Sequence, residues 1–427
     1  MLDIRFIREN PDKVKQALKN KNSKLDIDEL LNLDIERRKL LVKADMLKNT
    51  RNIESNEIAM LKKQGKDATT KMNEMKAVSQ KIKEIDIKVG DINRKISDIA
   101  LLVPNIPHSS IPIGPDATSN EIVKEWGKLP NFSFNPLNHI EIGEKLGIMD
   151  FLTATKLSGS GFPFFMGDGA KMVRALINFM IELHVKKHGY KEVWPPVLVS
   201  NKSMTTTGQL PKFEEDMYKL KDDDLYLIPT AEVPVTNIHR DDTFDEEDLP
   251  IYYTAYTPCF RREAGSYGKD TKGLSRVHQF DKVEMVKFVR PETSYDELES
   301  LLANAEEVLQ LLKLPYRVQV LSTGDISFAA SKCYDIELWA AGSATWLEVS
   351  SCSNFEDFQA RRGSIKFKSK ETGKLSYVHT LNGSGVAFAR LIIAIVENYQ
   401  TKEGFVEIPK ALQPYMGGEK IIKPVSK

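Results

Sequence analysis

The feature that most limits the fold of this chain is a seven-residue repeat of apolar side chains within its first hundred residues. Between residues 75 and 99 the repeat is strict and forms two rows: Met75, Ile82, Val89 and Ile96, and Val78, Ile85, Ile92 and Ile99. A weaker version precedes it in Leu30, Leu33, Leu40, Ala44, Leu47, Ile58 and Leu61. Alternating steps of three and four residues put these side chains on one side of a helix, which is typical of a coiled coil.

A short charged break, Lys62–Asp67, separates the two halves of the repeat and contains Gly65. Glycine among charged residues ends a helix, so we predict two long helices folded back on each other as an antiparallel hairpin. Most coiled coils are spacers or oligomerisation elements, and that interpretation stays open on the pattern alone. An arm that follows nucleic-acid phosphates is favoured by the lysines at the predicted tip, Lys62, Lys63, Lys66 and Lys71.

Proline separates this region from the rest of the chain. A proline-rich stretch, 104–136, predicts a connector between an N-terminal domain, 1–103, and a larger domain, 137–427. In the larger domain, helical stretches alternate with runs rich in β-branched and aromatic residues at 252–260, 278–289, 316–321, 346–349 and 364–367. Long loops join these runs, so we expect an α+β fold with a mostly antiparallel sheet and helices packed on it.

Charge and composition limit the classes of protein that fit. The 60 basic residues equal the 60 acidic ones, so any contact with RNA must depend on local basic patches. No segment approaches the roughly 20 apolar residues of a membrane-spanning helix, and the first residues lack a signal-peptide core. The three cysteines, Cys259, Cys333 and Cys352, are far apart and offer no zinc-site spacing. We therefore expect a cytoplasmic protein without zinc and without a membrane partner.

The first polar constellation is Phe260-Arg261-Arg262-Glu263, at the end of a predicted strand. A guanidinium at such a position can bind a phosphate through two hydrogen bonds, and the glycine-bearing loop that follows, 265–276, can fold over a nucleotide. Alternation along the returning strand places four side chains on one face: His278, Phe280, Lys282 and Glu284. A surface hairpin with salt bridges remains the alternative.

The second constellation, Thr380–Gly385, is expected to form a glycine-bearing loop that leads into an apolar helix. The start of that helix would present free backbone N–H groups to a ligand. Arg390 lies within the helix among apolar residues, where it needs a partner for its charge. A structural ion pair would also explain this arginine.

Two further constellations carry carboxylates. The first, Trp346–Asn354, contains Glu348 and Ser351, whose oxygens suit a hard cation such as Mg²⁺, although a solvated edge strand is the alternative. The second, Ile228–Pro234, holds Glu232 between two prolines and on its own is equally consistent with an ordinary loop.

Together these segments resemble the signature motifs of class II aminoacyl-tRNA synthetases. The resemblance is carried by the Phe-Arg-Arg-Glu hairpin, the Gly-Ser-Gly-x-Ala-x-x-Arg segment and the stretch Gly161–Ser200 with Glu192-Val193-Trp194-Pro195-Pro196. Three shorter motifs and the N-terminal arm are similar to those of seryl-tRNA synthetases of the bacterial type. The motifs are Thr230-Ala231-Glu232, His278-Gln279-Phe280 and Thr380–Gly385. The resemblance covers essentially the whole chain. It implies a serine–tRNA ligase that forms seryl-adenylate from serine and ATP and then transfers the seryl group to tRNA(Ser), and to tRNA(Sec) where present.

The resemblance also implies roles for individual residues. Arg261 and Arg390 would be catalytic. ATP would be bound by Arg261, Arg262, Glu263, Arg276, Val277, Phe280, Glu348, Val349, Ser350, Ser351 and Arg390. Serine would be bound by Thr230, Ala231, Glu232, Glu284, Thr380, Asn382 and Ser384, with Glu284 accepting the hydroxyl. Mg²⁺ would be held by Glu348 and Ser351, and the segment 166–199 would build a homodimer.

Two other functions fit parts of the pattern. A related enzyme could activate an amino acid and load it onto a carrier protein, but relatives of that kind lack the long arm. A coiled-coil scaffold with an inactive nucleotide pocket would not require the full set of Arg261, Glu263, Glu284, Glu348 and Arg390. Serine-dependent pyrophosphate exchange separates the scaffold from both enzymes, and charging of transfer RNA separates the two enzymes.

Overall fold

The computed structural model describes residues 1–263 and 273–424. They form two compact units, of which the smaller comprises Leu2–Lys19 and Ser23–Pro104 and the larger comprises Asn105–Lys427 with Met1 and Asn20–Asn22. The segment 104–136, expected as a connector, belongs almost entirely to the larger unit and contributes a strand to its main sheet. No helix in the described part of the chain is both long and apolar enough to cross a membrane.

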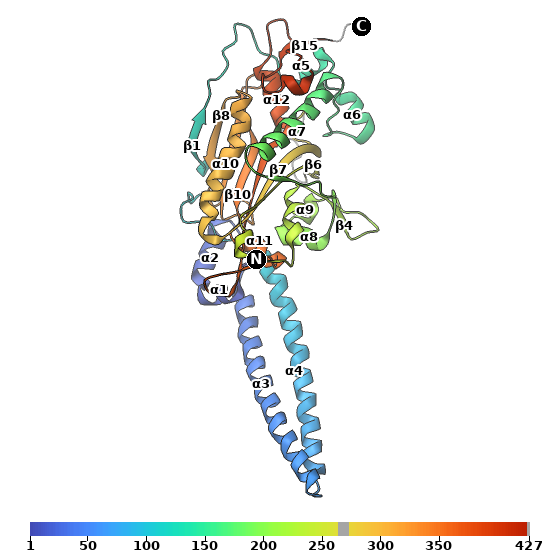
Figure 1. Ribbon diagram of the computed structural model, residues 1–427, viewed down its shortest axis with the longest axis vertical. Helices are drawn as coiled ribbons and strands as arrows, with labels where there is room; N and C mark the ends of the chain where they lie inside the picture. Colours follow the sequence, from blue (N-terminus) through green and yellow to red (C-terminus); the bar gives the residue numbers. More distant parts are fainter. Residues whose placement is uncertain (264–272, 425–427) are drawn as a thin grey trace. The chain divides into compact units, whose positions relative to one another are not determined.

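Two long helices form an antiparallel hairpin in the smaller unit (Figure 1). The N-terminal helices are α1 (Ile4–Glu9), α2 (Pro11–Asn20), α3 (Asp28–Lys63) and α4 (Thr69–Leu102). All eight residues of the strict repeat are buried or half-buried, whereas every other side chain from residue 75 to residue 99 is exposed. The predicted hairpin and its seam are therefore confirmed.

The weaker repeat in α3 has a structural explanation. Three of its seam positions carry polar side chains, Arg37, Arg51 and Glu54, which are half-buried. Near the base of α3, Asp34 is buried and accepts hydrogen bonds from Arg37 Nη2 at 2.6 Å and from Arg8 Nη1 of α1 at 3.1 Å. Burial alone would raise the pKa of Asp34, but these guanidinium contacts lower it below its ordinary value. Charge pairing thus takes over from apolar packing at this end of the hairpin.

The larger unit is built on an eight-stranded sheet in the order β1-β8-β9-β10-β13-β7-β6-β2. Its strands are β1 (Glu121–Trp126), β8 (Tyr316–Val320), β9 (Lys332–Ala340), β10 (Thr345–Asn354), β13 (His379–Ala387), β7 (Gln279–Val289), β6 (Ile251–Phe260) and β2 (Lys191–Glu192). Neighbouring strands are antiparallel except β2 and β6, which are parallel. The expected α+β fold with a mostly antiparallel sheet is confirmed.

The remaining elements surround this sheet. The helices are α5 (His139–Leu146), α6 (Phe151–Ser158), α7 (Asp168–Lys186), α8 (Asn201–Thr207), α9 (Glu232–Thr236), α10 (Ser294–Leu311), α11 (Phe358–Gly363) and α12 (Phe388–Asn398). Small sheets are formed by β12 (Leu375–Tyr377), β11 (Lys366–Lys368) and β5 (Thr243–Asp245), by β14 (Val406–Glu407) and β15 (Ile421–Ile422), and by β3 (Leu198–Ser200) and β4 (Leu225–Leu227). Figure 1 shows α7 and α10 lying along the main sheet.

Two glycines of β13 show which face of the sheet these helices cover. A Cβ at Gly383 would lie 3.0 Å from a leucine side chain of α10, and one at Gly385 would lie 2.8 Å from a histidine side chain of α7. Successive residues of a strand point to opposite faces, so Asn382 and Ser384 point away from α7 and α10. The sheet therefore has one face covered by these helices and one face that is free to form a site.

The structure corrects one expectation about this segment. Thr380–Gly385 is not a loop but part of β13, which lies between β10 and β7, and the helix that follows begins only at Phe388. The glycines are explained by the close packing of α7 and α10 rather than by a turn. Side chains of a central strand, not free N–H groups at the start of a helix, are what this motif offers to a ligand.

Candidate active site

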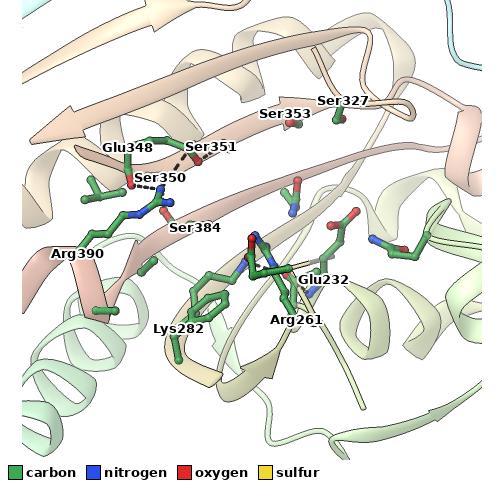
Figure 2. Close-up of a pocket in the computed structure, with 18 of the residues that line it drawn as sticks. Glu232, Arg261, Lys282, Ser327, Glu348, Ser350, Ser351, Ser353, Ser384 and Arg390 are labelled. Atoms are coloured by element: carbon green, nitrogen blue, oxygen red, sulfur yellow. Dashed lines mark hydrogen bonds and ion pairs between the residues drawn. The ribbon is translucent and has the colours of Figure 1, made fainter. Parts of the chain in front are cut away.

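A cavity opens on the face of the sheet that α7 and α10 leave free. Figure 2 shows Glu232, Arg261 and Lys282 in one part of it, and Glu348 and Arg390 in another. The sequence-predicted residues that line it are Thr230, Glu232, Arg261, Glu263, Arg276, Val277, Phe280, Glu348, Val349, Ser350, Ser351, Asn382, Ser384 and Arg390. Segments far apart in the sequence are thus brought to one place.

Four of the residues predicted to bind ATP or serine do not line the cavity: Ala231, Arg262, Glu284 and Thr380. Ala231 is buried beside α9, and the backbone N–H of Arg262 donates to the Asp216 carbonyl at 3.0 Å while its side chain is exposed. Glu284 and Thr380 instead lie directly behind residues that line the cavity, and each acts on them through hydrogen bonds.

Glu284 is fully buried on β7 and forms the centre of a polar network. Thr230 Oγ1 donates to its Oε2 at 2.6 Å, and Asn382 Nδ2 donates to its Oε1 at 3.2 Å. Lys282 Nζ forms an ion pair with the same Oε2 and donates to Thr230 Oγ1 at 2.8 Å. A buried carboxylate is stable only when it is paired and hydrogen-bonded, and all three partners here face the cavity.

Glu232, the first residue of α9, provides the second buried carboxylate. Gln359 Nε2 donates to its Oε1 at 2.6 Å, and Thr380 Oγ1 donates to Gln359 Oε1 at 2.8 Å. Thr380 therefore orients Glu232 through Gln359, a residue that the sequence analysis did not identify. Burial, with a smaller contribution from nearby Glu284, raises the pKa of Glu232 to about 7.

Arg261 follows directly after β6 and is held over the hairpin formed by β6 and β7. Its Nε donates to the Pro229 carbonyl at 3.3 Å, and its guanidinium carbon lies 5.2 Å from the centre of the Phe280 ring. The Pro229 contact fixes the arginine beside the segment that carries Thr230. A cation and an aromatic face thus stand together at the same point of the cavity.

Arg390 lies on α12 in the other part of the cavity. Its Nη1 donates to the Glu348 backbone carbonyl at 2.7 Å and lies 3.6 Å from Glu348 Oε2, and its Nε donates to the Ser275 carbonyl at 3.1 Å. The partner that this arginine required is therefore another predicted site residue. Arg390 therefore forms an ion pair with Glu348, and the same side chain also lines the cavity in which a ligand could bind.

Hard oxygen donors gather next to this arginine. Ser351 Oγ donates to Asp335 Oδ1 at 2.5 Å and lies 3.4 Å from Glu348 Oε1. Burial and the negative charge of Glu348 raise the pKa of Asp335 well above its ordinary value. A cation would relieve this repulsion, so the donors fit Mg²⁺. Since no group of three or more His, Cys, Asp or Glu side chains forms a metal site within residues 1–263 and 273–424, other oxygens must complete the coordination.

Glu263 and Arg276 contact each other at the edge of the cavity. Arg276 Nε donates to Glu263 Oε2 at 2.6 Å, and Glu263 has a φ of 52°, in the left-handed region. The glycine-bearing loop expected over 265–276 lies largely in residues 264–272, outside the described residues. The structure describes Glu263 and Arg276 on either side of the loop, and the loop itself remains a prediction.

Sequence reasoning did not assign a role to several site residues, and these residues differ in how far a sequence pattern indicates them. Strand alternation with Phe280 and Glu284 puts Lys282 on the face that forms the site, so the sequence pattern does indicate its position. Asp335 pairs directly with Ser351 in the register of β9 and β10, but only the strand pairing reveals this. Gln359 gave no signal, because it reaches the site from α11, more than 100 residues away from Glu232.

Comparisons with known proteins agree with this geometry. The family model "Seryl-tRNA synthetase N-terminal domain" matches residues 1–107, and "tRNA synthetase class II core domain (G, H, P, S and T)" matches residues 213–399. The serine–tRNA ligase of Carboxydothermus hydrogenoformans is 54% identical over 423 residues, covering 99% of this chain and 100% of the relative.

Two solved structures are also similar over the whole chain. Seryl-tRNA synthetase from Pyrococcus horikoshii, solved with ATP, has a TM-score of 0.94 and 39% identity, with 100% of both chains covered. The cytoplasmic serine–tRNA ligase of Naegleria fowleri, solved with AMP, has a TM-score of 0.89 and 31% identity, covering 100% of this chain and 99% of the other. This chain therefore belongs to the seryl-tRNA synthetases, the serine–tRNA ligases among the class II aminoacyl-tRNA synthetases.

Proposed function

We propose that this chain catalyses the reaction of its family in two steps within this one cavity. The serine carboxylate attacks the α-phosphorus of ATP and releases pyrophosphate, and the seryl group of the adenylate then passes to a ribose hydroxyl of tRNA(Ser). The observation that carries the proposal is that Arg261 and Arg390 line the same cavity as Glu232 and as Thr230 and Asn382, which hydrogen-bond the buried Glu284. One end therefore suits phosphates, and the other suits an ammonium and a hydroxyl.

ATP fits across the two parts of the cavity, with Phe280 and Arg261 in one part and Arg390 in the other. The adenine ring would stack on Phe280 with Arg390 on its other side, while Glu263 reads the adenine edge and Arg276 meets the outer phosphates. The ion pair between Glu263 and Arg276 would then exchange for contacts with the nucleotide. Arg261 would bridge the serine carboxylate and the α-phosphate, where charge develops in the transition state.

Mg²⁺ is the second proposed component. Glu348 and Ser351 would hold it, with Asp335 bonded to Ser351 from behind. The ion would neutralise phosphate oxygens and align them for displacement. No protein group is needed for proton transfer in adenylate formation, because the attacking serine group is already a carboxylate. Positioning and charge stabilisation are therefore the work of these side chains.

Serine fits the network around Glu284. Its α-ammonium would meet Thr230 and Glu232, and its hydroxyl would donate to Glu284, with Asn382 and Ser384 nearby. A site that hydrogen-bonds a substrate hydroxyl rejects the analogue lacking it by on the order of 10⁴, because its polar groups are left unpaired. Alanine would be excluded on this basis, and threonine mainly by size.

The hairpin is the proposed contact for transfer RNA. Lys62, Lys63 and Lys66 are exposed at its tip, where they can follow phosphates, and a helical arm suits the reading of RNA shape. Lys71 is half-buried and pairs with Glu54 and Glu57, so its charge is already balanced within the hairpin. The same enzyme would serylate tRNA(Sec) where one exists.

We further propose a cytoplasmic homodimer. Segment 166–199 exposes apolar side chains that suit a subunit interface: Met166, Val185, Trp194 and Leu198. The Trp194 side chain is 76% exposed although it packs against the Tyr256 ring at 5.7 Å. Large exposed apolar side chains grouped in one segment are typical of interaction surfaces.

Two assays with the purified protein test the function. ATP–pyrophosphate exchange should depend on serine and fail with alanine and threonine, and tRNA(Ser) should be charged with serine. Exchange without charging would favour loading of another acceptor, such as a carrier protein. Absence of serine-dependent exchange in a folded, monodisperse sample would contradict the assignment altogether.

A further inference from the structure

A lysine ammonium stands between the cavity and the proposed acceptor of the serine hydroxyl. Lys282 is only 4% exposed and Glu284 is 0% exposed, and of the two only Lys282 lines the cavity. Lys282 Nζ donates to Thr230 Oγ1 at 2.8 Å and forms an ion pair with Glu284 Oε2. In this arrangement a ligand in the cavity meets the ammonium before it meets the carboxylate.

Both oxygens of Glu284 already have partners in the structure. Its Oε1 already accepts a hydrogen bond from Asn382, and its Oε2 accepts from Thr230 as well as from the lysine. A serine hydroxyl that donates to Oε2 must therefore take the place of the Lys282 ammonium. Moving the Lys282 ammonium loses no ion pair or hydrogen bond overall if another cation takes over its acceptors.

Serine carries such a cation. Its α-ammonium has the same charge and the same three N–H donors as the ammonium of Lys282. The acceptors proposed for it, Thr230 and Glu232, include the atom that Lys282 now contacts. Two carboxylates, Glu232 and Glu284, are balanced here by Lys282 and Arg261, so an added ammonium would free one of the two cations.

The geometry of β7 indicates where the freed ammonium would go. Phe280, Lys282 and Glu284 alternate along one face of this strand, so neighbouring members are about 7 Å apart. Lys282 thus begins midway between the ring proposed for adenine and the acceptor proposed for the hydroxyl. In the proposed site the serine carboxylate would meet the α-phosphate in this interval, and both groups are anionic.

We propose that Lys282 is an exchangeable counter-ion: it occupies the place of the serine α-ammonium and, when serine binds, moves to the junction of the serine carboxylate and the α-phosphate. The inference rests on the proposed serine site. In the chemical step a carboxylate oxygen forms a bond to the α-phosphorus while the bond to the pyrophosphate oxygen breaks. Lys282 transfers no atom and no proton; it balances charge at the reacting groups and acts as a positioning residue for Glu284.

The test separates serine binding from turnover in Lys282→Met. Equilibrium dialysis with labelled serine, without ATP, should give a Kd equal to that of the wild type or lower, because nothing must be displaced. The kcat of serine-dependent pyrophosphate exchange should fall by about 10²-fold, since a charge at the reacting groups is lost. Lys282→Arg should recover part of kcat. If Lys282→Met folds poorly, Lys282→Gln replaces it in the test and should show the same unchanged or lower Kd for serine and the same loss of kcat.

Lys287 provides a matched control on the same strand. It is also buried, pairs with Glu297 at 2.8 Å and lies on the face covered by α10. Lys287→Met should lower the melting temperature while leaving both the Kd for serine and kcat within about threefold of the wild type. A Kd for serine weakened more than about threefold by the Lys282 substitutions, or an unchanged kcat, overturns the proposal. Lack of serine-dependent exchange in the wild type would overturn the proposed function instead.

Discussion

The hairpin buries apolar side chains and exposes its charged ones, whereas the larger unit, Asn105–Lys427 with Met1 and Asn20–Asn22, here called the catalytic unit, buries several charged side chains in its site. Between residues 75 and 99 of the hairpin only the apolar seam is buried, and the lysines and glutamates face outward. In the catalytic unit the charges themselves are buried, as Glu232, Lys282 and Glu284 show. A hairpin made in this way can present charge to a large partner, whereas a site made in the other way can compare small groups such as a hydroxyl and a methyl.

The strongest way to break this comparison is to remove the distal part of the hairpin. Residues 49–85 can be replaced by a four-residue Gly/Ser linker that closes directly beyond the Lys48–Asp86 ion pair, since packed helices are about 10 Å apart. Charging of tRNA(Ser) should fall by on the order of 10³-fold or more because most phosphate contacts are lost. Pyrophosphate exchange should stay within about twofold.

The design retains the Asp34 cluster at the base of α3, so the remaining helices keep their charge pairing. Circular dichroism should show loss of helix in proportion to the deleted residues and no further unfolding. A parallel loss of exchange would mean that the catalytic unit depends on the arm to fold, and the two regions would not be separable.

The same contrast explains what could be predicted from the sequence. The environment of Ile85 or Ile92 depends on neighbours three and four residues away, so the repeat was sufficient to predict the hairpin. Strand alternation placed Glu284 on the correct face for a similar reason. The contacts that Glu284 makes with Thr230 and Asn382 join residues 54 and 98 positions away, and no local pattern contains them.

The same limit explains the one corrected segment. Glycines and polar residues in Thr380–Gly385 have low strand propensity, and only pairing with β10 and β7 makes the segment a strand. The family resemblance predicted site residues without this pairing, and most of those predicted for ATP and serine line the cavity. It did not reveal that Thr380 acts through Gln359, or that Lys282 covers Glu284.

Replacing Arg261 tests the part of the catalytic unit proposed to bind the serine carboxylate and the α-phosphate. Arg261→Ala should lower serine-dependent pyrophosphate exchange by about 10³-fold, because a preorganised cation at the developing charge is lost. The neighbouring Arg262→Ala is the matched comparison, since the Arg262 side chain does not line the cavity, and we expect a loss of at most about tenfold. Equal losses in both variants would remove Arg261 from its special role. Melting temperatures of both proteins should match the wild type within a few degrees.

Glu232 should make the catalytic unit sensitive to pH. Its pKa is raised to about 7, so the carboxylate that would pair with the serine ammonium is present above pH 7 and is lost as the pH falls. The kcat/KM for serine should fall about tenfold from pH 8 to pH 6, as expected for one group titrating at that value. Glu232→Gln should be less active and should lose this dependence.

The hairpin should not share this sensitivity. Hydrogen bonds from Thr69 lower the pKa of Asp67, and the arginine cluster lowers that of Asp34, so both carboxylates stay ionised between pH 6 and pH 8. The KM for tRNA(Ser) should therefore change little over the range in which kcat/KM for serine falls. A rise in the KM for tRNA(Ser) that parallels the fall in kcat/KM for serine would show that the titrating group is not in the serine pocket.

The smallest expected effects concern single lysines at the tip of the hairpin, and they sharpen the comparison within the hairpin itself. Lys62, Lys63 and Lys66 are exposed, whereas Lys71 lies in the seam row of Val78 and Ile85. Lys71 Nζ there contacts Glu54 Oε2 at 2.8 Å and Glu57 Oε2 at 2.5 Å. Alanine at each exposed lysine should raise the KM for tRNA(Ser) by about twofold to threefold, because each removes one screened phosphate contact.

The dependence on salt distinguishes the two kinds of lysine. A lysine that contacts a phosphate releases about one counter-ion on binding, so its removal should lower the slope of log KM against log salt concentration by about one. Lys71→Ala should leave the slope unchanged and instead reduce the helical content on heating, because it leaves Glu54 in the seam and the exposed Glu57 without their shared cation. A reduced slope for Lys71→Ala would mean that RNA displaces Glu54 and Glu57, and the hairpin would then use the same counter-ion exchange that we infer for Lys282.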